Sequence, residues 1–213
     1  MPAVKNYLSL IKFSHTIFAM PFALTGFVLG VAGISFSVVP GWHTRIYPDG
    51  FWTFVIWKFV FVILCMVFAR SAAMAFNRYL DRRFDAKNPR TAIREIPSGI
   101  ITHKNALVFT VINAVLFVTC TWFINRLCFF LSPVALFVIL FYSYTKRFTA
   151  LCHLVLGLGL SLAPIGAYLA VMERFDLLPV LFSFAVLFWV TGFDIIYALQ
   201  DEAFDKENDL YSM

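Results

Sequence analysis

The chain has 213 residues, of which 61% are hydrophobic and only 14% are charged, and its net charge is +5. A soluble domain carries about a quarter charged residues, so the composition excludes an ordinary soluble globule and favours a protein dissolved in lipid. The basic residues lie between apolar runs and form no single patch. This distribution favours a role in membrane orientation over nucleic-acid binding.

Stretches without charged residues recur along the chain, and several approach the roughly 20 apolar residues that cross a bilayer. The first is too long for a signal peptide and has no cleavage site of small residues. No boundary rich in Gly, Ser or Pro divides the chain, so we expect one domain over residues 1–213. The predicted fold class is all-α, a multi-spanning transmembrane bundle of about six helices. The expected spans are residues 13–44, 51–77, 105–125, 127–145, 148–172 and 177–193, with the last continuing helically to about residue 200.

The distribution of Lys and Arg predicts how these helices are oriented. If the N-terminus lies inside, most basic residues fall in inside segments, above all in residues 78–104. The outside loops then hold only Arg45, Arg126 and Arg174. We therefore expect a cytoplasmic N-terminus and even-numbered helices that end in the cytoplasm. The expected location is the inner membrane of a bacterium.

The second span runs out into an acidic motif, in which Asn77, Asp81 and Asp85 are spaced by four residues. On a helix this spacing places all three side chains on one face. Two carboxylates about 6 Å apart repel by about 2–3 kcal/mol at an effective dielectric constant near 20, so a buried column needs a counter-charge. Mg²⁺ is a natural one because it takes hard oxygen ligands and keeps substrate phosphates as partners. Arg70 lies seven residues before Asn77, on the same face but deeper in the bilayer.

A second acidic motif ends the sixth span, where Asp194, Tyr197, Asp201 and Asp205 follow one another at spacings of three and four. These spacings again place the side chains on one helix face. A carboxylate at membrane depth costs about 2.5–3.5 kcal/mol, so Asp194, which follows a long apolar run, indicates function. Each motif alone is equally well explained as a solvated charge cluster at the membrane surface. Two one-face acidic columns on the same side of the membrane are much harder to explain in this way.

Basic residues accompany both motifs on the predicted inside. Arg90 and Arg94, in the loop after the first motif, carry the planar guanidinium that clamps a diphosphate, although each is also explained as a membrane anchor. Lys146 and Arg147 end the fourth span on the same side and offer two more cations. The four cysteines lie in apolar runs without a CxxC pair, so we expect small buried hydrophobes. No transition-metal site is assigned, because no ligand spacing links His15, His43, His103 and His153.

Taken together, these motifs resemble the UbiA superfamily of intramembrane aromatic prenyltransferases, and the resemblance covers essentially the whole chain. Residues 12–23 resemble the branch that makes quinones from 4-hydroxybenzoate. The paired motifs in this order are specific, whereas either one alone is weak. The motifs that carry the resemblance are Asn77-x₃-Asp81-x₃-Asp85, the loop from Arg90 to Gly99, Tyr144-x-Lys146-Arg147, and Asp194-x₂-Tyr197-Ala198-x₂-Asp201-x₃-Asp205.

The resemblance implies a Mg²⁺-dependent transferase that moves a polyprenyl group from its diphosphate to an aromatic acid such as 4-hydroxybenzoate, in ubiquinone or menaquinone biosynthesis. It also implies a role for each motif residue. Those implied to bind Mg²⁺ are Asn77, Asp81, Asp85, Asp201 and Asp205. Those implied to contact the diphosphate are Arg94, Lys146, Arg147 and Asn77. Asp194 and Tyr197 are implied to orient the acceptor or shield the allylic cation, and they complete the catalytic set with Asp81, Asp85, Asp201 and Asp205.

Two features depart from the family pattern. Many members have Asp directly after the motif asparagine, where this chain has Arg78, and this change removes one possible ligand. The family fold has nine transmembrane helices, so with about six here we expect a C-terminal truncation, and a catalytically inactive remnant is one alternative reading. A divalent-cation transporter is another, and it predicts acids through the full membrane depth. A CDP-alcohol phosphatidyltransferase is less well supported, because its Asp-Gly-x₂-Ala-Arg signature is absent.

Overall fold

The computed structural model describes residues 2–37, 50–202 and 207. Every regular element in this part of the chain is a helix. Six of the helices are long and apolar enough to cross a membrane. They are α2 (Phe13–Ser37), α4 (Phe51–Asp85), α5 (His103–Ile124), α6 (Arg126–Thr145), α7 (Cys152–Met172) and α8 (Leu177–Ala198). The predicted all-α, multi-spanning bundle of an integral membrane protein is confirmed.

The helix ends differ from the expected spans in three places. α4 continues past the apolar stretch to Asp85, as the four-residue spacing of its acidic motif predicts. α7 begins at Cys152, because residues 146–151 form turns between it and α6. α8 gives way to a single 3₁₀ turn, η1 (Leu199–Asp201), so the α-helical spacing stops within the second motif. The first span was expected to reach residue 44, and its last residues lie outside the described part of the chain.

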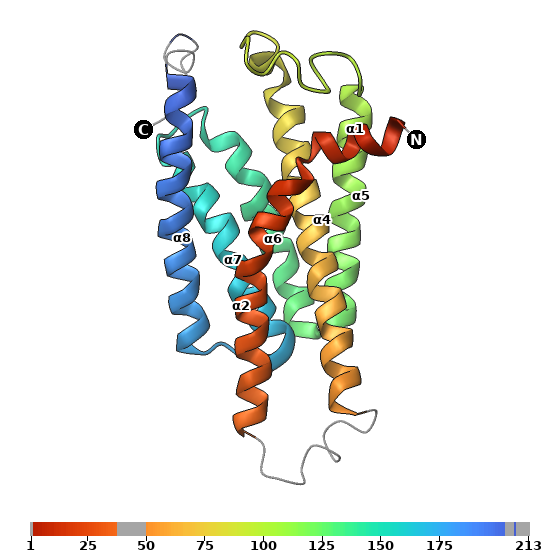
Figure 1. Ribbon diagram of the computed structural model, residues 1–213, viewed down its shortest axis with the longest axis vertical. Helices are drawn as coiled ribbons and strands as arrows, with labels where there is room; N and C mark the ends of the chain where they lie inside the picture. The colour runs from red at the N-terminus through yellow and green to blue at the C-terminus, as the bar shows by residue number, and fades with distance from the viewer. Residues whose placement is uncertain (1, 38–49, 203–206, 208–213) are drawn as a thin grey trace.

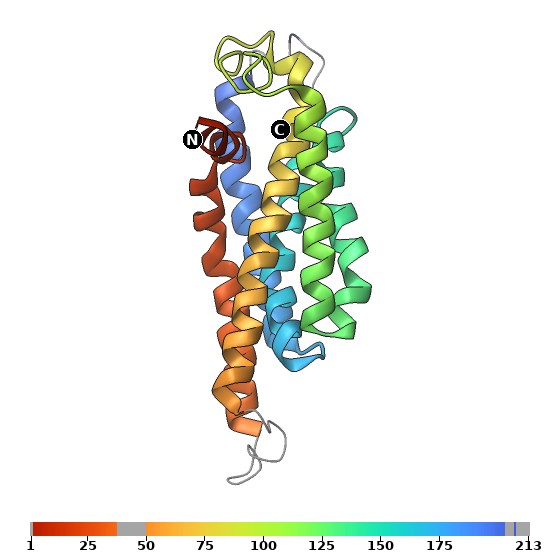
Figure 2. The ribbon, with the colours of Figure 1, turned by 90° about the vertical axis from the view of Figure 1, so that its right-hand side faces the viewer.

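A short helix that the sequence does not predict, α1 (Pro2–Leu10), precedes the first span. Figure 1 shows α1 lying across the end of the bundle at which residues 86–102 also lie, and Figure 2 shows the same arrangement from the side. Leu10 is fully buried in a small core with Ile96 and Ile101, and the Tyr7 ring stacks on Phe109 of α5 at 4.9 Å. These contacts hold the loop after α4 against the bundle.

Small residues allow the helices to approach closely, as is usual in membrane bundles. A Cβ atom on Gly26 of α2 would come within 1.8 Å of the Pro164 carbonyl oxygen of α7. A Cβ on Gly157 of α7 would likewise meet the Leu187 carbonyl oxygen of α8 at 2.6 Å. Backbone therefore packs on backbone at both crossings, and α7 is fixed between α2 and α8.

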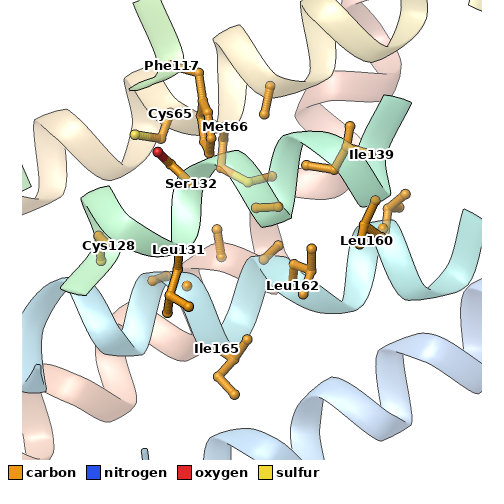
Figure 3. A pocket seen from close by; sticks show the side chains of 18 of the residues that line it. Cys65, Met66, Phe117, Cys128, Leu131, Ser132, Ile139, Leu160, Leu162 and Ile165 are labelled. Atoms are coloured by element: carbon orange, nitrogen blue, oxygen red, sulfur yellow. The ribbon is translucent and has the colours of Figure 1, made fainter. Parts of the chain in front are cut away.

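The inner faces of α4, α6 and α7 leave an apolar cavity of about 340 Å³ inside the bundle (Figure 3). Met66 of α4, Leu131 and Ile139 of α6 and Leu162 of α7 line it. Among the described residues that line this cavity, Arg70 alone is charged. The apolar cavity is thus a hydrophobic chamber with one cation in its wall.

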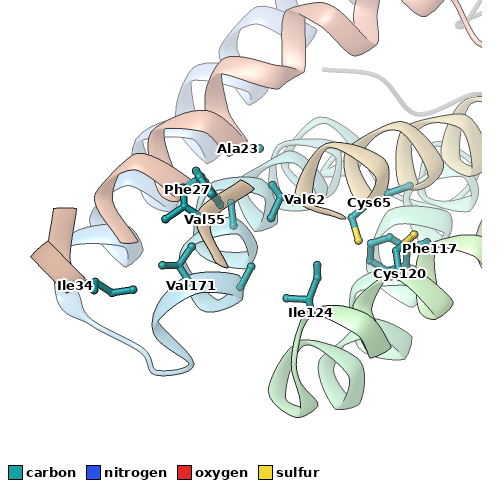
Figure 4. Packing of buried hydrophobic residues seen from close by; sticks show 13 residues of the cluster. Ala23, Phe27, Ile34, Val55, Val62, Cys65, Phe117, Cys120, Ile124 and Val171 are labelled. Carbon is teal, nitrogen blue, oxygen red and sulfur yellow. The ribbon is translucent and has the colours of Figure 1, made fainter. Parts of the chain in front are cut away.

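The main hydrophobic core packs beside this cavity and joins α2, α4, α5 and α7 (Figure 4). Phe27, Val62, Phe117 and Val171 are among its buried members. Lys58 of α4 is also buried, at 6% exposure. Its Nζ donates a hydrogen bond to the carbonyl oxygen of Ile124, the last residue of α5, and lies 3.7 Å from Glu173 Oε1. A buried cation therefore caps the C-terminal end of α5.

Candidate active site

A second cavity, of about 240 Å³, is polar and is lined by the C-terminal end of α4, the loop after it, the α6–α7 turn and the end of α8. It brings together residues that the sequence singled out on four separate segments. Those that line it are Asn77, Asp81, Asp85, Arg90, Arg94, Lys146, Arg147, Asp194 and Tyr197. Both acidic motifs therefore reach one cavity at one end of the bundle.

The α4 column forms one wall of the polar cavity. Asn77 Nδ2 donates a hydrogen bond to Asp81 Oδ2 at 3.3 Å, which links two successive turns of the column. Asp85, the last residue of α4, is 6% exposed. Its carbonyl oxygen accepts a hydrogen bond from Thr91 Oγ1 at 3.0 Å, so the following loop folds back over the helix end. This fold-back brings the loop's cations to the column.

Each carboxylate of the column faces an arginine from another segment. Arg147 Nη2 lies 3.3 Å from Asp81 Oδ1 and also donates to the Leu80 carbonyl oxygen at 3.0 Å. Arg94 Nη1 lies 2.7 Å from Asp85 Oδ1. The attraction offsets the cost of burying two acids one helical turn apart. In this arrangement the two arginines supply the counter-charge that the column needs.

The second motif contributes Asp194 and Tyr197 to the polar cavity. Asp194 Oδ2 lies 2.7 Å from Nδ1 of His153, which is 4% exposed at the start of α7. The side chain of Asp201 and the whole of Asp205 lie outside the described residues. The second predicted metal set therefore stays a prediction, while Asp194 has a defined partner.

The donors of the α4 column fit a Mg²⁺ ion. No group of three or more His, Cys, Asp or Glu side chains converges within the described part of the chain. Mg²⁺ is commonly held by one or two carboxylates together with substrate phosphates and water, and Asp81 and Asp85 supply two carboxylates. Asp85 Oδ2 is buried and has no hydrogen-bond partner among the described residues. Asn77 adds an amide oxygen, so the donor set consists of hard oxygen ligands.

The polar and apolar cavities adjoin, because Tyr142 of α6 and Leu156 of α7 line both. Arg70 lines the apolar cavity, and its buried Nε has no hydrogen-bond partner within the described part of the chain. A buried guanidinium N–H without a partner in an apolar wall is costly unless an acceptor completes it. The junction between the cavities thus has charged groups on its polar side and one cation on its apolar side.

Arg78 occupies the position at which many members of the UbiA superfamily, which the motifs resemble, have Asp. It does not line either cavity. It is 4% exposed, and its Nη1 lies 3.9 Å from Glu95 Oε2 in the loop. Ser9 of α1 donates a hydrogen bond to the other oxygen of Glu95. The substitution therefore places a cation beside the loop and α1, outside both cavities but within electrostatic range of Asp85 and Arg94.

Several residues of the polar cavity were not predicted from the sequence, and they have polar or ionisable side chains: Asn88, Thr91, Tyr142, Ser143 and His153. Tyr142 lies four residues before Lys146, so helix periodicity offered a signal for it. His153 carries no such signal, because turns separate it from the preceding motif and its partner is 41 residues away.

The fold and site define a class, an integral membrane bundle with a carboxylate- and cation-lined cavity beside an apolar one. The family model described as the UbiA prenyltransferase family matches residues 19–213. The chain belongs to the UbiA prenyltransferase family. This assignment agrees with the predicted prenyltransferase class and not with the transporter or phosphatidyltransferase alternatives.

Curated relatives carry the name 4-hydroxybenzoate octaprenyltransferase. The protein from Tolumonas auensis is 35% identical over 141 residues, which is 66% of this chain and 48% of that protein. The protein from Francisella tularensis subsp. novicida is 32% identical over 142 residues, or 67% of this chain and 50% of that one. The chain thus spans about half the length of these curated relatives.

Solved structures of UbiA homologues share the fold. The apo structure of a homologue from Aeropyrum pernix K1 superposes with a TM-score of 0.76 at 29% identity and covers 93% of this chain and 68% of that one. A homologue from Archaeoglobus fulgidus, bound to GPP and Mg²⁺, superposes with a TM-score of 0.66 at 20% identity, over 98% of this chain and 68% of that one. At 20% identity, the similarity to the Archaeoglobus fulgidus homologue supports the fold alone.

Proposed function

We propose that this chain transfers a polyprenyl group from its diphosphate to an aromatic acid such as 4-hydroxybenzoate, in a Mg²⁺-dependent step of quinone biosynthesis. The observation that carries the proposal is the meeting of the two cavities at Tyr142 and Leu156. A polyprenyl diphosphate has the same two chemistries, a polyanion and a hydrocarbon, joined at one C–O bond. The scissile bond then lies at the junction.

The polar cavity serves the departure of the diphosphate. Asn77, Asp81 and Asp85 would hold a Mg²⁺, which when bound would neutralise charge that develops on the leaving oxygen. Arg94, Lys146 and Arg147 bind the other diphosphate oxygens and orient them. Asp201 and Asp205 would hold a second Mg²⁺ in this proposal. The C–O bond breaks with its electron pair staying on the diphosphate, and the prenyl group becomes an allylic cation.

The acceptor lies at the junction between the cavities. Arg70 pairs with the acceptor's carboxylate, because its guanidinium lines the apolar cavity and its Nε is unpartnered in the described structure. Asp194, held by His153, and Tyr197 orient the phenol and shield the cation. The ring carbon ortho to the hydroxyl then bonds to the allylic carbon, and the proton on that ring carbon passes to the departed diphosphate, which restores aromaticity.

The proposed location is the inner membrane of a bacterium, with the polar cavity at the cytoplasmic face. The excess of Lys and Arg in residues 78–104 supports this orientation under the positive-inside rule. Soluble 4-hydroxybenzoate then reaches the site from the cytoplasm, while the prenyl chain stays in the hydrophobic chamber. The names of the curated relatives support the choice of acceptor.

The test uses the full chain reconstituted in lipid vesicles with labelled polyprenyl diphosphate, Mg²⁺ and 4-hydroxybenzoate. We expect prenylated acid from the unaltered chain, and a loss of at least about 100-fold in Asp81→Asn and Asp85→Asn, because each removes charge that stabilises the departing diphosphate. Asp176→Asn is the matched control, because Asp176 is an acid between α7 and α8 that lines neither cavity. Full activity of Asp85→Asn would contradict the proposed site. An unaltered chain that inserts but prenylates no aromatic acid would favour the inactive alternative.

A further inference from the structure

The two acids of the α4 column are already neutralised by arginines in this structure, and the pairs differ in closeness. Arg94 Nη1 approaches Asp85 Oδ1 to 2.7 Å, within the range of a strong charge-assisted hydrogen bond. Arg147 Nη2 is 3.3 Å from Asp81 Oδ1, which is longer than that range. The oxygens that accept from these arginines belong to the same carboxylates that offer ligands to a divalent cation.

We propose that Arg94 and Arg147 are built-in counter-ions that exchange partners: they neutralise Asp85 and Asp81 in the ligand-free protein and turn to the diphosphate when it arrives with its metal. The inference rests on the proposed function, since it concerns the same metal–diphosphate site. Its consequence is that the site binds a divalent cation weakly alone and binds metal and diphosphate cooperatively.

The electrostatics of the column require such an exchange. A guanidinium at hydrogen-bond distance from a carboxylate repels a divalent cation that approaches the same group. The repulsion is strongest at Asp85, which is 6% exposed, and weaker at Asp81, whose side chain is 26% exposed. An incoming diphosphate removes the conflict, because it offers oxygens to both the metal and the displaced arginine. Metal therefore assists diphosphate binding and, by linkage, diphosphate assists metal binding to the same extent.

The surroundings of both arginines fit a side chain that changes partner without moving its stem. The Arg147 guanidinium lies 5.7 Å from the ring centroids of both Phe84 and Tyr144. Its Nε is buried and has no partner among the described residues, so it keeps a free donor. Arg94 is held by the loop that covers the end of α4, and it lines the polar cavity together with Asp85. Both guanidinium groups therefore already border the space that a diphosphate would fill.

The experiment measures binding and not turnover, with the purified full chain. Mn²⁺ serves as the probe, and its free-ion EPR signal reports binding in the absence of diphosphate. We expect Arg94→Met to bind Mn²⁺ about tenfold more tightly than the unaltered chain, and Arg147→Met a few-fold more tightly because its pair is longer. In a second titration, at saturating Mg²⁺, both variants should bind labelled inorganic diphosphate at least about tenfold more weakly.

Three controls separate the outcomes. Arg82→Met removes a positive charge from the C-terminal end of α4, close to both acids, but Arg82 lines neither cavity, so both affinities should stay unchanged. Arg94→Lys and Arg147→Lys keep a positive charge, so their Mn²⁺ affinity should remain near that of the unaltered chain. This result would show that the methionine variants change Mn²⁺ affinity through charge and not through misfolding. Asp85→Asn should weaken Mn²⁺ binding.

Methionine variants that bind Mn²⁺ no more tightly than the unaltered chain would overturn the exchange, even if they bind diphosphate weakly. If Asp85→Asn left both affinities unchanged, the proposed metal–diphosphate site would itself be wrong, and the exchange would fall with it. Tighter Mn²⁺ binding combined with weaker diphosphate binding is expected only from arginines that serve both partners.

Discussion

Two cations on α4, the half-buried Arg70 and the buried Lys58, should respond in opposite ways to replacement by methionine. Lys58 has partners, since it donates to the Ile124 carbonyl oxygen and faces Glu173. Arg70 Nε has none among the described residues, and its side chain lines the apolar cavity. The physical difference is that the fold gives Lys58 partners, whereas it leaves one buried N–H of Arg70 without an acceptor.

The expected magnitudes follow from this difference. A hydrogen bond that involves a charged group contributes about 1.5–3 kcal/mol, so Lys58→Met should destabilise the protein by about that amount. Glu173 adds little, because its side chain is 57% exposed. Arg70→Met removes a half-buried charge with an unpartnered N–H, so stability should stay the same or rise. The same change removes the proposed contact with the acceptor's carboxylate, and KM for 4-hydroxybenzoate should rise about 10- to 150-fold.

The assay pairs thermal unfolding in detergent with initial rates at saturating prenyl diphosphate. The two acceptors compared are 4-hydroxybenzoate and p-cresol, which keeps the phenol but has a methyl group in place of the carboxylate. Arg70→Met should lose its preference for the acid while KM for the prenyl diphosphate stays unchanged. An equal loss for both acceptors, or a destabilisation as large as that of Lys58→Met, would refute the reasoning.

Three further outcomes are expected. His153→Ala should lower kcat about tenfold, because Asp194 on α8 loses the bond that orients its carboxylate. His153→Gln keeps an N–H donor and should recover most of the rate. Equal losses in the two variants would argue against an orienting bond. Gly26→Ala should destabilise the bundle by at least about 1–3 kcal/mol in thermal unfolding, because its Cβ would meet a carbonyl of α7 at 1.8 Å, while Gly192→Ala, which meets nothing within 4 Å, should not. For topology, Ile93→Cys, at a loop position that is 82% exposed, should be shielded from impermeant thiol reagents in intact cells, and Arg174→Cys at the other end of the bundle should be labelled; the reverse pattern would invert the proposed orientation.

The helices could be predicted because lipid imposes a length and an apolar composition on any helix that crosses it. The α4 column could be predicted as well, since its spacing depends only on helix geometry. The short helix α1 could not, because its nine residues are too few to cross a bilayer and it is held by contacts with distant segments such as Phe109. The length and apolar pattern of a helix are local properties of the sequence, whereas the contacts that hold α1 against the bundle depend on segments far away in the chain.

The partners of the site residues required the fold. The spacing indicated that Asp81 and Asp85 need counter-charge, but which arginine each faces depends on the fold-back of the loop and on the α6–α7 turn. The pairing of His153 with Asp194 is invisible in sequence for the same reason. The 3₁₀ turn η1 also shows where a spacing argument stops, because it changes the helical period just before the second half of the second motif.

The central claim is that the two adjoining cavities hold the two halves of one prenyl diphosphate, and the natural cysteines test it directly. Cys65 and Cys128 line the apolar cavity and Cys152 lines the polar one, while Cys120 lines neither. The measurement is the alkylation rate of each cysteine by N-ethylmaleimide, followed by peptide mass spectrometry on the unaltered chain with Mg²⁺. A polyprenyl diphosphate should slow alkylation of Cys65, Cys128 and Cys152 relative to Cys120, and inorganic diphosphate should slow only Cys152. Protection of Cys152 alone by the polyprenyl diphosphate, or of none of the three, would contradict the account.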